Sequence, residues 1–371
     1  MNAEFLLRSL AARPQAEAQD AVKFLFQNAY GCGHLLPEAS ACAESIGKEI
    51  ALSHTADAEP AFEPLGSGLC RLNLRAPLVR ALPPERIARM MRVTAEQFQP
   101  SPVRFTDNLS VLLALAGRYG TDAPPAATFL SLPFTAAELD AAAGRHAASG
   151  GLPRHSERYR EAYRPAYRVV LRRYAEALPL LAALERRLAD TGRATLALDG
   201  DCASGKTTLV ALLEPLYDCN VFHMDDFFLP YALRTPERLL EPGGNVHYER
   251  FRREVLDSLP SGKPFTYGAF SCKTGETRSV AVTPRPVSLI EGSYALHPTF
   301  DGAYRRLDAV KALLTVSPAE QRDRILARNG EAMLRRFQNE WIPLEIQYFQ
   351  AYHKTREDRL ILSGHQSAED L

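Results

Sequence analysis

One stretch constrains the fold of this chain more than any other: LALDGDCASGKTTLV, residues 196–210. Within it, Gly200 to Thr207 fits the pattern G-x-x-x-x-G-K-[ST] at every fixed position. Glycines let the backbone curl so that successive N–H groups point inward, and the positive end of the following helix faces the same point. The pattern therefore predicts a strand, a phosphate-binding loop and a helix, in that order.

Each fixed position of this loop has a predicted role. The backbone N–H groups hold nucleotide phosphates, Lys206 reaches the β- and γ-phosphates, and the Thr207 hydroxyl ligates Mg²⁺. A chance match is improbable, because the chain has only seven lysines and none lies between Lys48 and Lys206. The residues expected to contact the nucleotide are Gly200, Asp201, Cys202, Ala203, Ser204, Gly205, Lys206, Thr207 and Thr208.

The sequence pattern changes near residue 188. After it, short apolar runs alternate with helix-like segments, which predicts a parallel sheet with helices on both faces. The runs are RATLALDG, CNVFHMDD, PVSLIEGS, AVKALLTV and DRLILSG. We therefore expect an α/β domain of the P-loop NTPase type over residues 189–371, preceded by a separate domain over residues 1–188.

The first 188 residues are predicted to be mostly α-helical. Apolar residues recur at helical spacing in PPERIARMMRVTAEQF, and a longer stripe runs from Tyr167 to Leu188, with Pro179 as a kink. In QNAYGCGHLLPE, the Gly-Cys-Gly triplet predicts a turn between helices. Further on, Ser156 is the expected N-cap of ERYREAYR. The arginines and tyrosines of that segment fit an anion-binding face or a subunit contact of a homo-oligomer.

Composition argues against several classes of protein. Acidic and basic residues balance at 44 each, so no long-range field attracts nucleic acid. No apolar run approaches the ~18 residues of a membrane helix. The six cysteines form no C-x-x-C pair, and Cys32, His34 and Cys42 lack the spacing of a zinc site. We expect a cytoplasmic protein with reduced thiols and neither a nucleic-acid nor a membrane partner.

Two acidic segments follow predicted strands. Asp225 and Asp226 stand in VFHMDDFFLP, and Glu291 stands in LIEGSY. Ligands of open α/β sheets bind at the carboxyl ends of the strands. One of the two aspartates is therefore expected to accept a proton from an attacking hydroxyl or to help hold Mg²⁺, and Glu291 suits a metal-side role. Acidic residues after strands also serve as helix or turn caps.

The stretch SPAEQRDRILARNGEAMLRRF is rich in arginine and is interrupted by Asn-Gly. Such a segment suits a mobile lid over phosphates, where one arginine in the transition state is worth ~10³-fold or more in rate. We choose Arg324 and Arg328 as the catalytic arginines. The alternative is a solvated helix face with ion pairs between residues four apart.

The order of the motifs along the chain points to one family. GDCASGKTT, HMDDFF, GGNVHYERF, FTYGAF, LIEGSYALHP and the arginine-rich segment together resemble the uridine kinase family. Its wider relatives include phosphoribulokinase and bacterial pantothenate kinase. The resemblance covers roughly residues 190–371. It implies ATP and Mg²⁺ as cofactors, Asp225 as the catalytic base, and Glu291 on the magnesium side.

The resemblance also implies residues that contact the phosphate acceptor: Asp225, Phe228, His247 and Tyr267. Here the chain departs from the family pattern. His247 stands where the family has an aspartate that grips the ribose hydroxyls. The stretch near Tyr267 and Cys272 lacks the histidine that the family uses near the pyrimidine.

The resemblance thus predicts a kinase that phosphorylates a hydroxyl of a small molecule, with a uridine- or cytidine-like nucleoside as the first expectation. The alternative acceptors are another metabolite, such as a sugar acid or a pantothenate-like alcohol. A third reading is a regulatory protein in which the P-loop senses nucleotide and the helical half is the effector.

Overall fold

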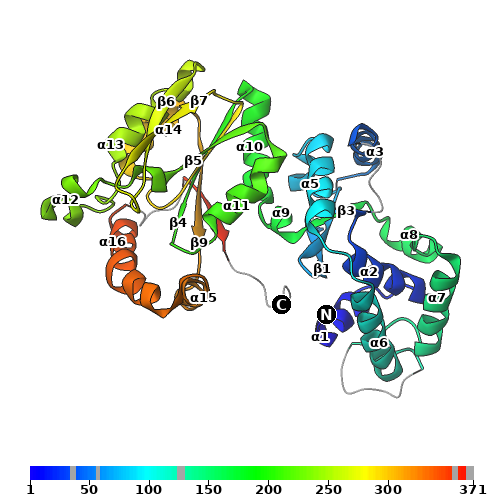
Figure 1. Cartoon of the computed structure of the whole chain (residues 1–371). Helices are drawn as coiled ribbons and strands as arrows, with labels where there is room; N and C mark the ends of the chain where they lie inside the picture. Colours follow the sequence, from blue (N-terminus) through cyan, green and yellow to red (C-terminus); the bar gives the residue numbers. More distant parts are fainter. Residues whose placement is uncertain (34–38, 56–58, 123–129, 353–357, 365–371) are drawn as a thin grey trace. The chain divides into compact units, whose positions relative to one another are not determined.

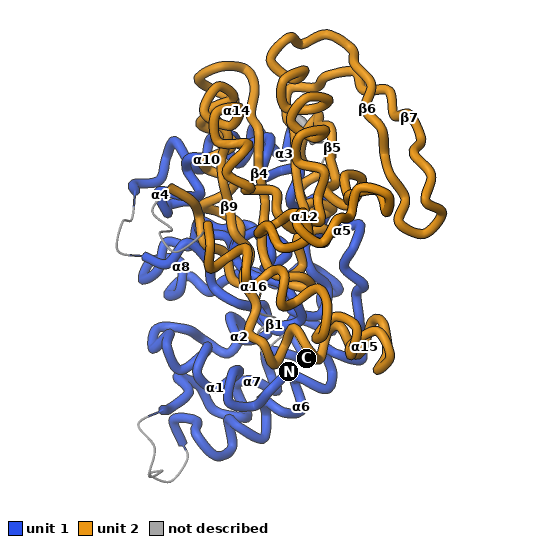
Figure 2. Tube along the Cα trace, turned by 90° about the vertical axis from the view of Figure 1, so that its left-hand side faces the viewer, with its two compact units in different colours: residues 1–176, 366–371 blue, residues 177–365 orange. Residues whose placement is uncertain are grey.

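The computed structural model describes residues 1–33, 39–55, 59–122, 130–352 and 358–364. The chain forms two compact units, one ending at Glu176 and the other starting at Ala177 (Figure 2). The boundary expected at residue 188 falls inside helix α10 (Leu178–Thr191). This helix belongs wholly to the second unit because it packs against two strands of that unit's sheet. His34 and residues 365–371 of the predicted second domain lie outside the described residues.

The first unit is mostly helical, as predicted, and it also contains a small antiparallel sheet of strand order β1-β2-β3. Its strands are β1 (Phe62–Gly66), β2 (Leu69–Asn73) and β3 (Tyr167–Leu171). Its helices are α1 (Ala3–Ala11), α2 (Ala18–Tyr30), α3 (Ala39–Leu52), α4 (Pro77–Arg80), α5 (Pro84–Gln97), α6 (Pro102–Tyr119), α7 (Ala136–Ser149), α8 (Glu157–Tyr163) and α9 (Arg172–Glu176).

The helical stripe expected from Tyr167 to Leu188 is wrong in its first part. Tyr167–Leu171 forms β3, which pairs with β2 along its whole length, and only then do α9 and α10 begin. The β1–β2 hairpin turns at Gly66, Ser67 and Gly68, which all have positive φ. Pairing with a segment almost a hundred residues away outweighs the local helical spacing.

Local signals in this unit are otherwise confirmed. Helix α5 begins with a proline in its first turn, as the paired prolines predicted. The Ser156 side chain accepts a hydrogen bond from the backbone N–H of Tyr159 and so caps α8. Helix α2 ends at Tyr30, and Gly31 follows it with φ of 64°. The Gly-Cys-Gly triplet therefore ends the helix at the predicted place.

The second unit is built on a five-stranded sheet of order β10-β9-β4-β8-β5, in which every neighbouring pair is parallel (Figure 1). All five predicted strands are confirmed. They are β4 (Ala194–Gly200), β5 (Cys219–His223), β8 (Val287–Glu291), β9 (Val310–Thr315) and β10 (Leu360–Ser363). Strand β8 pairs with β4, and β5 pairs with β8, all in parallel, so their carboxyl ends bring the residues after them to one edge of the sheet.

Helices complete the layers around this sheet. Helix α10 packs on β4 and β9, and α11 (Lys206–Leu213) packs on β4 and β8. The register partners Ala197, Ile290 and Phe222 point to one common face, where they join a buried cluster. That cluster includes residues of α13 (Tyr248–Phe251) and α14 (Asp301–Arg306). The predicted α/β fold is therefore confirmed, and no helix among the described residues is long and apolar enough to cross a membrane.

Two further parts matter for the site. The antiparallel strands β6 (Phe265–Phe270) and β7 (Thr277–Val282) form a hairpin, and α12 (Pro236–Leu240) precedes α13. After β9, the arginine-rich segment forms α15 (Pro318–Arg336), whose backbone is non-helical at Gly330, with φ of 76° and ψ of 172°. Helix α16 (Ile342–Tyr352) follows. The predicted break at Asn-Gly is therefore present.

Candidate active site

The phosphate-binding loop connects β4 to α11. A Cβ atom at Gly200 would collide with the carbonyl oxygen of Leu314 on β9, so only glycine allows β4 to approach its neighbour here. Gly205 precedes α11 with φ of 103°, and Ala203 also has positive φ. The loop thus curls over the N-terminus of α11, the end that carries the positive part of the helix dipole. The second unit is a P-loop domain.

Lys206 is buried, and its side chain turns back over the loop. The ammonium donates to the carbonyl oxygens of Gly200, at 2.7 Å, and Asp201, at 2.8 Å. These bonds hold the positive charge at the concave side of the P-loop.

Thr207 connects the P-loop to the carboxylate at the end of β8. Its hydroxyl lies 3.2 Å from each carboxylate oxygen of Glu291. Glu291 is buried, and His223 at the end of β5 approaches it with Nδ1 2.6 Å from Oε1. This hydrogen bond, more than any other influence, raises the pKa of His223 above its usual value. His223, which the sequence analysis did not select, thus orients the expected metal-side carboxylate.

Asp225 lies in the 3₁₀ turn Met224–Phe227 that follows β5. Solvent reaches its side chain, yet the surrounding protein atoms raise the pKa of its carboxyl group. The negative charge of Glu291 raises this pKa further. The structure therefore brings together three of the predicted site residues, Thr207, Glu291 and Asp225, beside the P-loop lysine, whose charge acts in the opposite direction.

Phe228 and His247, which the resemblance places near the acceptor, lie on two adjacent segments. Phe228 forms a β-bridge with Val246, and the backbone N–H of His247 donates to the carbonyl of Phe227 at 2.7 Å. The His247 ring lies with Nδ1 3.2 Å from a carboxylate oxygen of Glu249. Phe228 and His247 therefore lie on two segments whose backbones are hydrogen-bonded to each other.

Tyr267 is a buried residue of β6. Its ring stacks on Phe227 with 5.3 Å between centroids, and its hydroxyl donates to the Asp226 carboxylate at 3.1 Å. The two neighbouring aspartates therefore have different surroundings. Asp226 is hydrogen-bonded to the β6–β7 hairpin, whereas Asp225 lies near Glu291. In this structure the Tyr267 hydroxyl is thus engaged by Asp226, the neighbour of Asp225.

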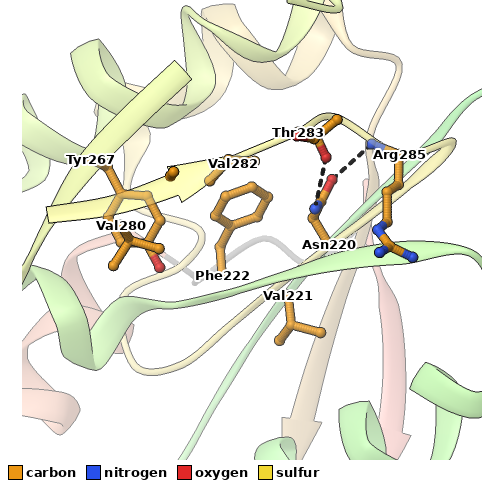
Figure 3. A pocket seen from close by; sticks show the side chains of 9 residues that line it. Asn220, Val221, Phe222, Tyr267, Val280, Val282, Thr283 and Arg285 are labelled. Carbon is orange, nitrogen blue, oxygen red and sulfur yellow. Dashed lines mark hydrogen bonds between the residues drawn. The ribbon is translucent and has the colours of Figure 1, made fainter. Parts of the chain in front are cut away.

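Tyr267 also lines a cavity of about 320 Å³ between β5 and the β6–β7 hairpin (Figure 3). Asn220 closes one end of it by donating to the Thr283 carbonyl and accepting from the Arg285 N–H. The β5 residues that line it, Asn220 to Phe222, all precede Asp225, which follows the end of the strand.

The two chosen arginines of α15 differ in position. Arg324 donates to the carbonyls of Ala203 and Ser204 in the P-loop, at 3.2 and 3.3 Å, and also to the Gly364 carbonyl. Arg328 is exposed and donates to the Asn329 side chain. The structure thus places Arg324 against the loop backbone and Arg328 at the surface, next to the break at Gly330.

Two carboxylates of the site were missed by sequence reasoning. Asp199, the last residue before the loop, is fully buried and accepts from the N–H groups of Gly200, Tyr294 and Leu296. An acidic residue inside the apolar run LALDG is the signal that could have revealed it. Glu345 on α16 accepts from the Cys202 N–H at 2.9 Å and the Ser293 hydroxyl at 2.8 Å. Nothing in the sequence around Glu345 marks it.

Among the described residues, no group of three or more His, Cys, Asp or Glu side chains is arranged to hold a metal ion. The oxygen atoms that we consider as metal ligands near the P-loop are instead those of the Thr207 hydroxyl and the Glu291 carboxylate. Mg²⁺ prefers such hard oxygen ligands and typically binds through one or two carboxylates together with substrate phosphates and water. These two residues fit that mode of binding.

No protein-family model and no curated protein matches this chain. Solved structures similar to its C-terminal half include a protein described as a fructose transport system kinase from Silicibacter sp. TM1040, at 24% identity, which covers 50% of this chain and 95% of that one with a TM-score of 0.37. A protein described as a uridine kinase from Bacillus stearothermophilus has 20% identity, coverage of 50% and 99%, and a TM-score of 0.32. D-glycerate 3-kinase from Cryptococcus neoformans has 15% identity, coverage of 52% and 96%, and a TM-score of 0.37. Each of these likenesses covers about half of this chain.

Proposed function

We propose that this chain is an ATP-dependent kinase that transfers the γ-phosphoryl group to a hydroxyl of a small molecule. The observation that carries the proposal is the contact of the Thr207 hydroxyl with both oxygens of Glu291, close to Asp225 and at the end of the P-loop. P-loop NTPases in general have a carboxylate on the metal side, so the second carboxylate, Asp225, is what favours transfer to a hydroxyl over nucleotide binding alone. A phosphoryl transfer to a hydroxyl needs a proton acceptor and a carboxylate on the metal side.

The residues divide this chemistry among them. The P-loop N–H groups and Lys206 bind the phosphates and stabilise charge as it develops on the γ-phosphoryl oxygens. Thr207 and Glu291 would hold Mg²⁺, which when bound neutralises charge on the β- and γ-phosphates. Asp225 accepts the proton of the acceptor hydroxyl. Its raised pKa makes it a stronger base than an ordinary aspartate.

The acceptor that we propose first is a nucleoside of the uridine or cytidine type, next to Asp225, Phe228, His247 and Tyr267. A sugar acid or a pantothenate-like alcohol is the alternative, because His247 supplies an imidazole where the uridine kinase pattern has a carboxylate. The six free cysteines are consistent with a cytoplasmic location, which is part of the proposal.

The test is ADP release by the purified full chain with Mg-ATP. The panel of acceptors comprises uridine, cytidine, D-glycerate, fructose and pantothenate. Lys206→Ala serves as the blank, and Lys263→Ala, a change at an exposed lysine, serves as the matched control. Stimulation by one acceptor, lost only in Lys206→Ala, is the expected result.

A rate that no hydroxyl compound stimulates would contradict the kinase proposal. If such a protein still hydrolysed ATP slowly and bound a partner only with nucleotide, the regulatory alternative would replace it. Stimulation by D-glycerate or pantothenate and not by nucleosides would support the kinase proposal and contradict the proposal that the acceptor is a nucleoside.

A further inference from the structure

The first unit contains a cavity of about 340 Å³ that the P-loop chemistry does not involve. Ligand pockets of proteins typically start near ~300 Å³. The wall combines apolar atoms with several polar and charged side chains. It is formed by Lys23, Gln27, Cys42, Ser45, Glu49, Met91, His155, Pro165, Tyr167, Arg168 and Val169.

Lys23 is the cation of this wall that lacks a counterion. No residue of the described part of the chain forms an ion pair or a hydrogen bond with its ammonium. Burial, followed by the positive charge of Arg71, lowers its pKa to about 8. Arg154 and Arg160 lower this pKa further, and the negative charge of Asp20 opposes them. An ammonium kept among like charges is costly unless an anion joins it.

Arg71 places a second positive charge next to the wall. It is buried, its guanidinium lies 4.8 Å from the centre of the Tyr167 ring, and its Nε–H donates to the Gln27 side chain at 2.8 Å. Glu63 accepts from one of its nitrogens, but Nη2 is buried and has no hydrogen-bond partner among the residues that the structure describes. A buried guanidinium nitrogen with no acceptor calls for an explanation.

The acidic groups around the cavity are already engaged. Glu49 pairs with Arg168 at 2.7 Å, and Glu63 pairs with both Arg13 and Arg71. Asp20 accepts from His155 and from the backbone and hydroxyl of Ser156. Within the described part of the chain, Lys23 therefore has no ion-pair partner, and one nitrogen of Arg71 has no acceptor.

A chain of hydrogen bonds fixes the polar part of the wall. Arg71 donates to Gln27, the Gln27 amide donates to the Tyr167 hydroxyl at 3.3 Å, and that hydroxyl lies 2.7 Å from Nε2 of His155. The other ring nitrogen of His155 lies 2.8 Å from Asp20. Burial lowers the pKa of His155 to about 4, so the ring is neutral, with Nδ1–H donating to Asp20 and Nε2 accepting from Tyr167. Such a wall is preorganised and needs no rearrangement to receive a ligand.

We propose that this cavity is a binding site for a small metabolite with an anionic head group, a carboxylate or a phosphate, and an apolar body. The head group would pair with Lys23, and the apolar part would contact Met91, Pro165 and Val169. The N-terminal unit is then a ligand-binding unit in its own right, whatever the P-loop domain phosphorylates.

The test is isothermal titration calorimetry on the full chain carrying Lys206→Ala, which removes phosphate binding by the P-loop. The probes are inorganic phosphate, phenyl phosphate and benzoate, so that head group and apolar body are varied separately. The comparison variants add Lys23→Met, or Lys48→Met as a control at an exposed lysine of α3 that pairs with Glu44. Lys23→Met removes an unpaired, partly buried charge, so the fold should be retained, which circular dichroism checks.

We expect saturable binding of phenyl phosphate or benzoate to the Lys206→Ala protein, weakened at least ~10-fold by Lys23→Met and unchanged by Lys48→Met. Preference for phenyl phosphate or for benzoate identifies the head group. Absence of saturable binding by all three probes, or equal affinity with Lys23→Met, would overturn the proposal. Because Lys206→Ala is present throughout, the result does not depend on kinase activity.

Discussion

The hydroxyl of Tyr348, on α16, donates to the buried carboxylate of Asp199 at 2.8 Å. This bond joins the last described helix of the P-loop domain to the strand that enters the P-loop. The same carboxylate accepts three backbone N–H groups, one from the loop and two from the segment after β8. One side chain thus holds together the three segments that surround the nucleotide site.

We predict that Asp199→Asn destabilises the P-loop domain by about 2–3 kcal/mol, because the new amide N–H₂ must face groups that are themselves donors. Tyr348→Phe should cost about 1 kcal/mol, since it removes one donor. Urea unfolding followed by the fluorescence of Trp341, the only tryptophan, reports on this unit. Asp218→Asn, at an exposed carboxylate paired with Arg285, is the control. Equal unfolding midpoints for Asp199→Asn and Asp218→Asn would contradict the argument.

The contact between Thr207 and Glu291 leads to a prediction about magnesium. Glu291→Gln keeps the shape of the side chain and removes its charge. The Mg²⁺ concentration for half-maximal activity should rise ~10- to 100-fold, the range found when groups that support a metal site are changed. Activity is titrated with Mg²⁺ at saturating ATP, with Glu276→Gln, a change at an exposed glutamate, as the control. An unchanged Mg²⁺ requirement would remove Glu291 from the metal side.

Arg324 and Arg328 should affect different kinetic constants. Arg324 contacts the P-loop carbonyls, so Arg324→Ala should loosen the loop and weaken ATP binding ~10-fold. Arg328 is a surface residue next to the break at Gly330, and we predict that its charge reaches the phosphates only when this segment closes. Arg328→Ala should then lower kcat at least ~10-fold with little change in ATP affinity.

Affinity is measured by nucleotide titration, and kcat by ADP release. Arg322→Ala, at an exposed arginine of the same helix that pairs with Asp323, is the matched control. If Arg328→Ala behaves like Arg322→Ala, Arg328 belongs to a solvated helix face and not to a lid.

The sheet of the P-loop domain could be predicted because each strand is a short apolar run bounded by turn-forming residues. SLIEG ends where the chain must leave the sheet, so the acidic residue Glu291 could be placed at its edge, whereas Asp199 in LALDG was overlooked. The loop itself was predicted because Gly200 and Gly205 stand where the backbone requires conformations that other residues adopt at a cost.

Contacts between distant segments could not be predicted in this way. β3 forms because it pairs with β2, and a window around Tyr167 contains no trace of that partner. Glu345 reaches Cys202 only because α16 returns to the loop after the break at Gly330, and helical periodicity carries no information about that return. His223 was overlooked for the same reason, since its contact with Glu291 depends on two strands being neighbours.

The neutral His155 leads to a prediction about pH. In the folded chain, burial lowers its pKa to about 4, while a histidine in an unfolded chain has a pKa near ~6.5. Between these two pH values the unfolded state binds a proton that the folded state does not. Stability therefore falls as the pH is lowered from about 6.5 toward 4, by up to about 3 kcal/mol, and this contribution is constant above that window.

Scanning calorimetry at pH 7 and pH 5 measures this effect as a drop in the thermal midpoint of the N-terminal unit. His155→Gln should lower the midpoint at pH 7, because the Asp20 and Tyr167 contacts are disturbed, but it should reduce the difference between the two pH values. His54→Gln, at an exposed histidine of the same unit, should leave that difference as in the wild type. If the drop between pH 7 and pH 5 is as large in His155→Gln as in the wild type, another group is responsible, and the Tyr167 hydroxyl is not held by a neutral imidazole.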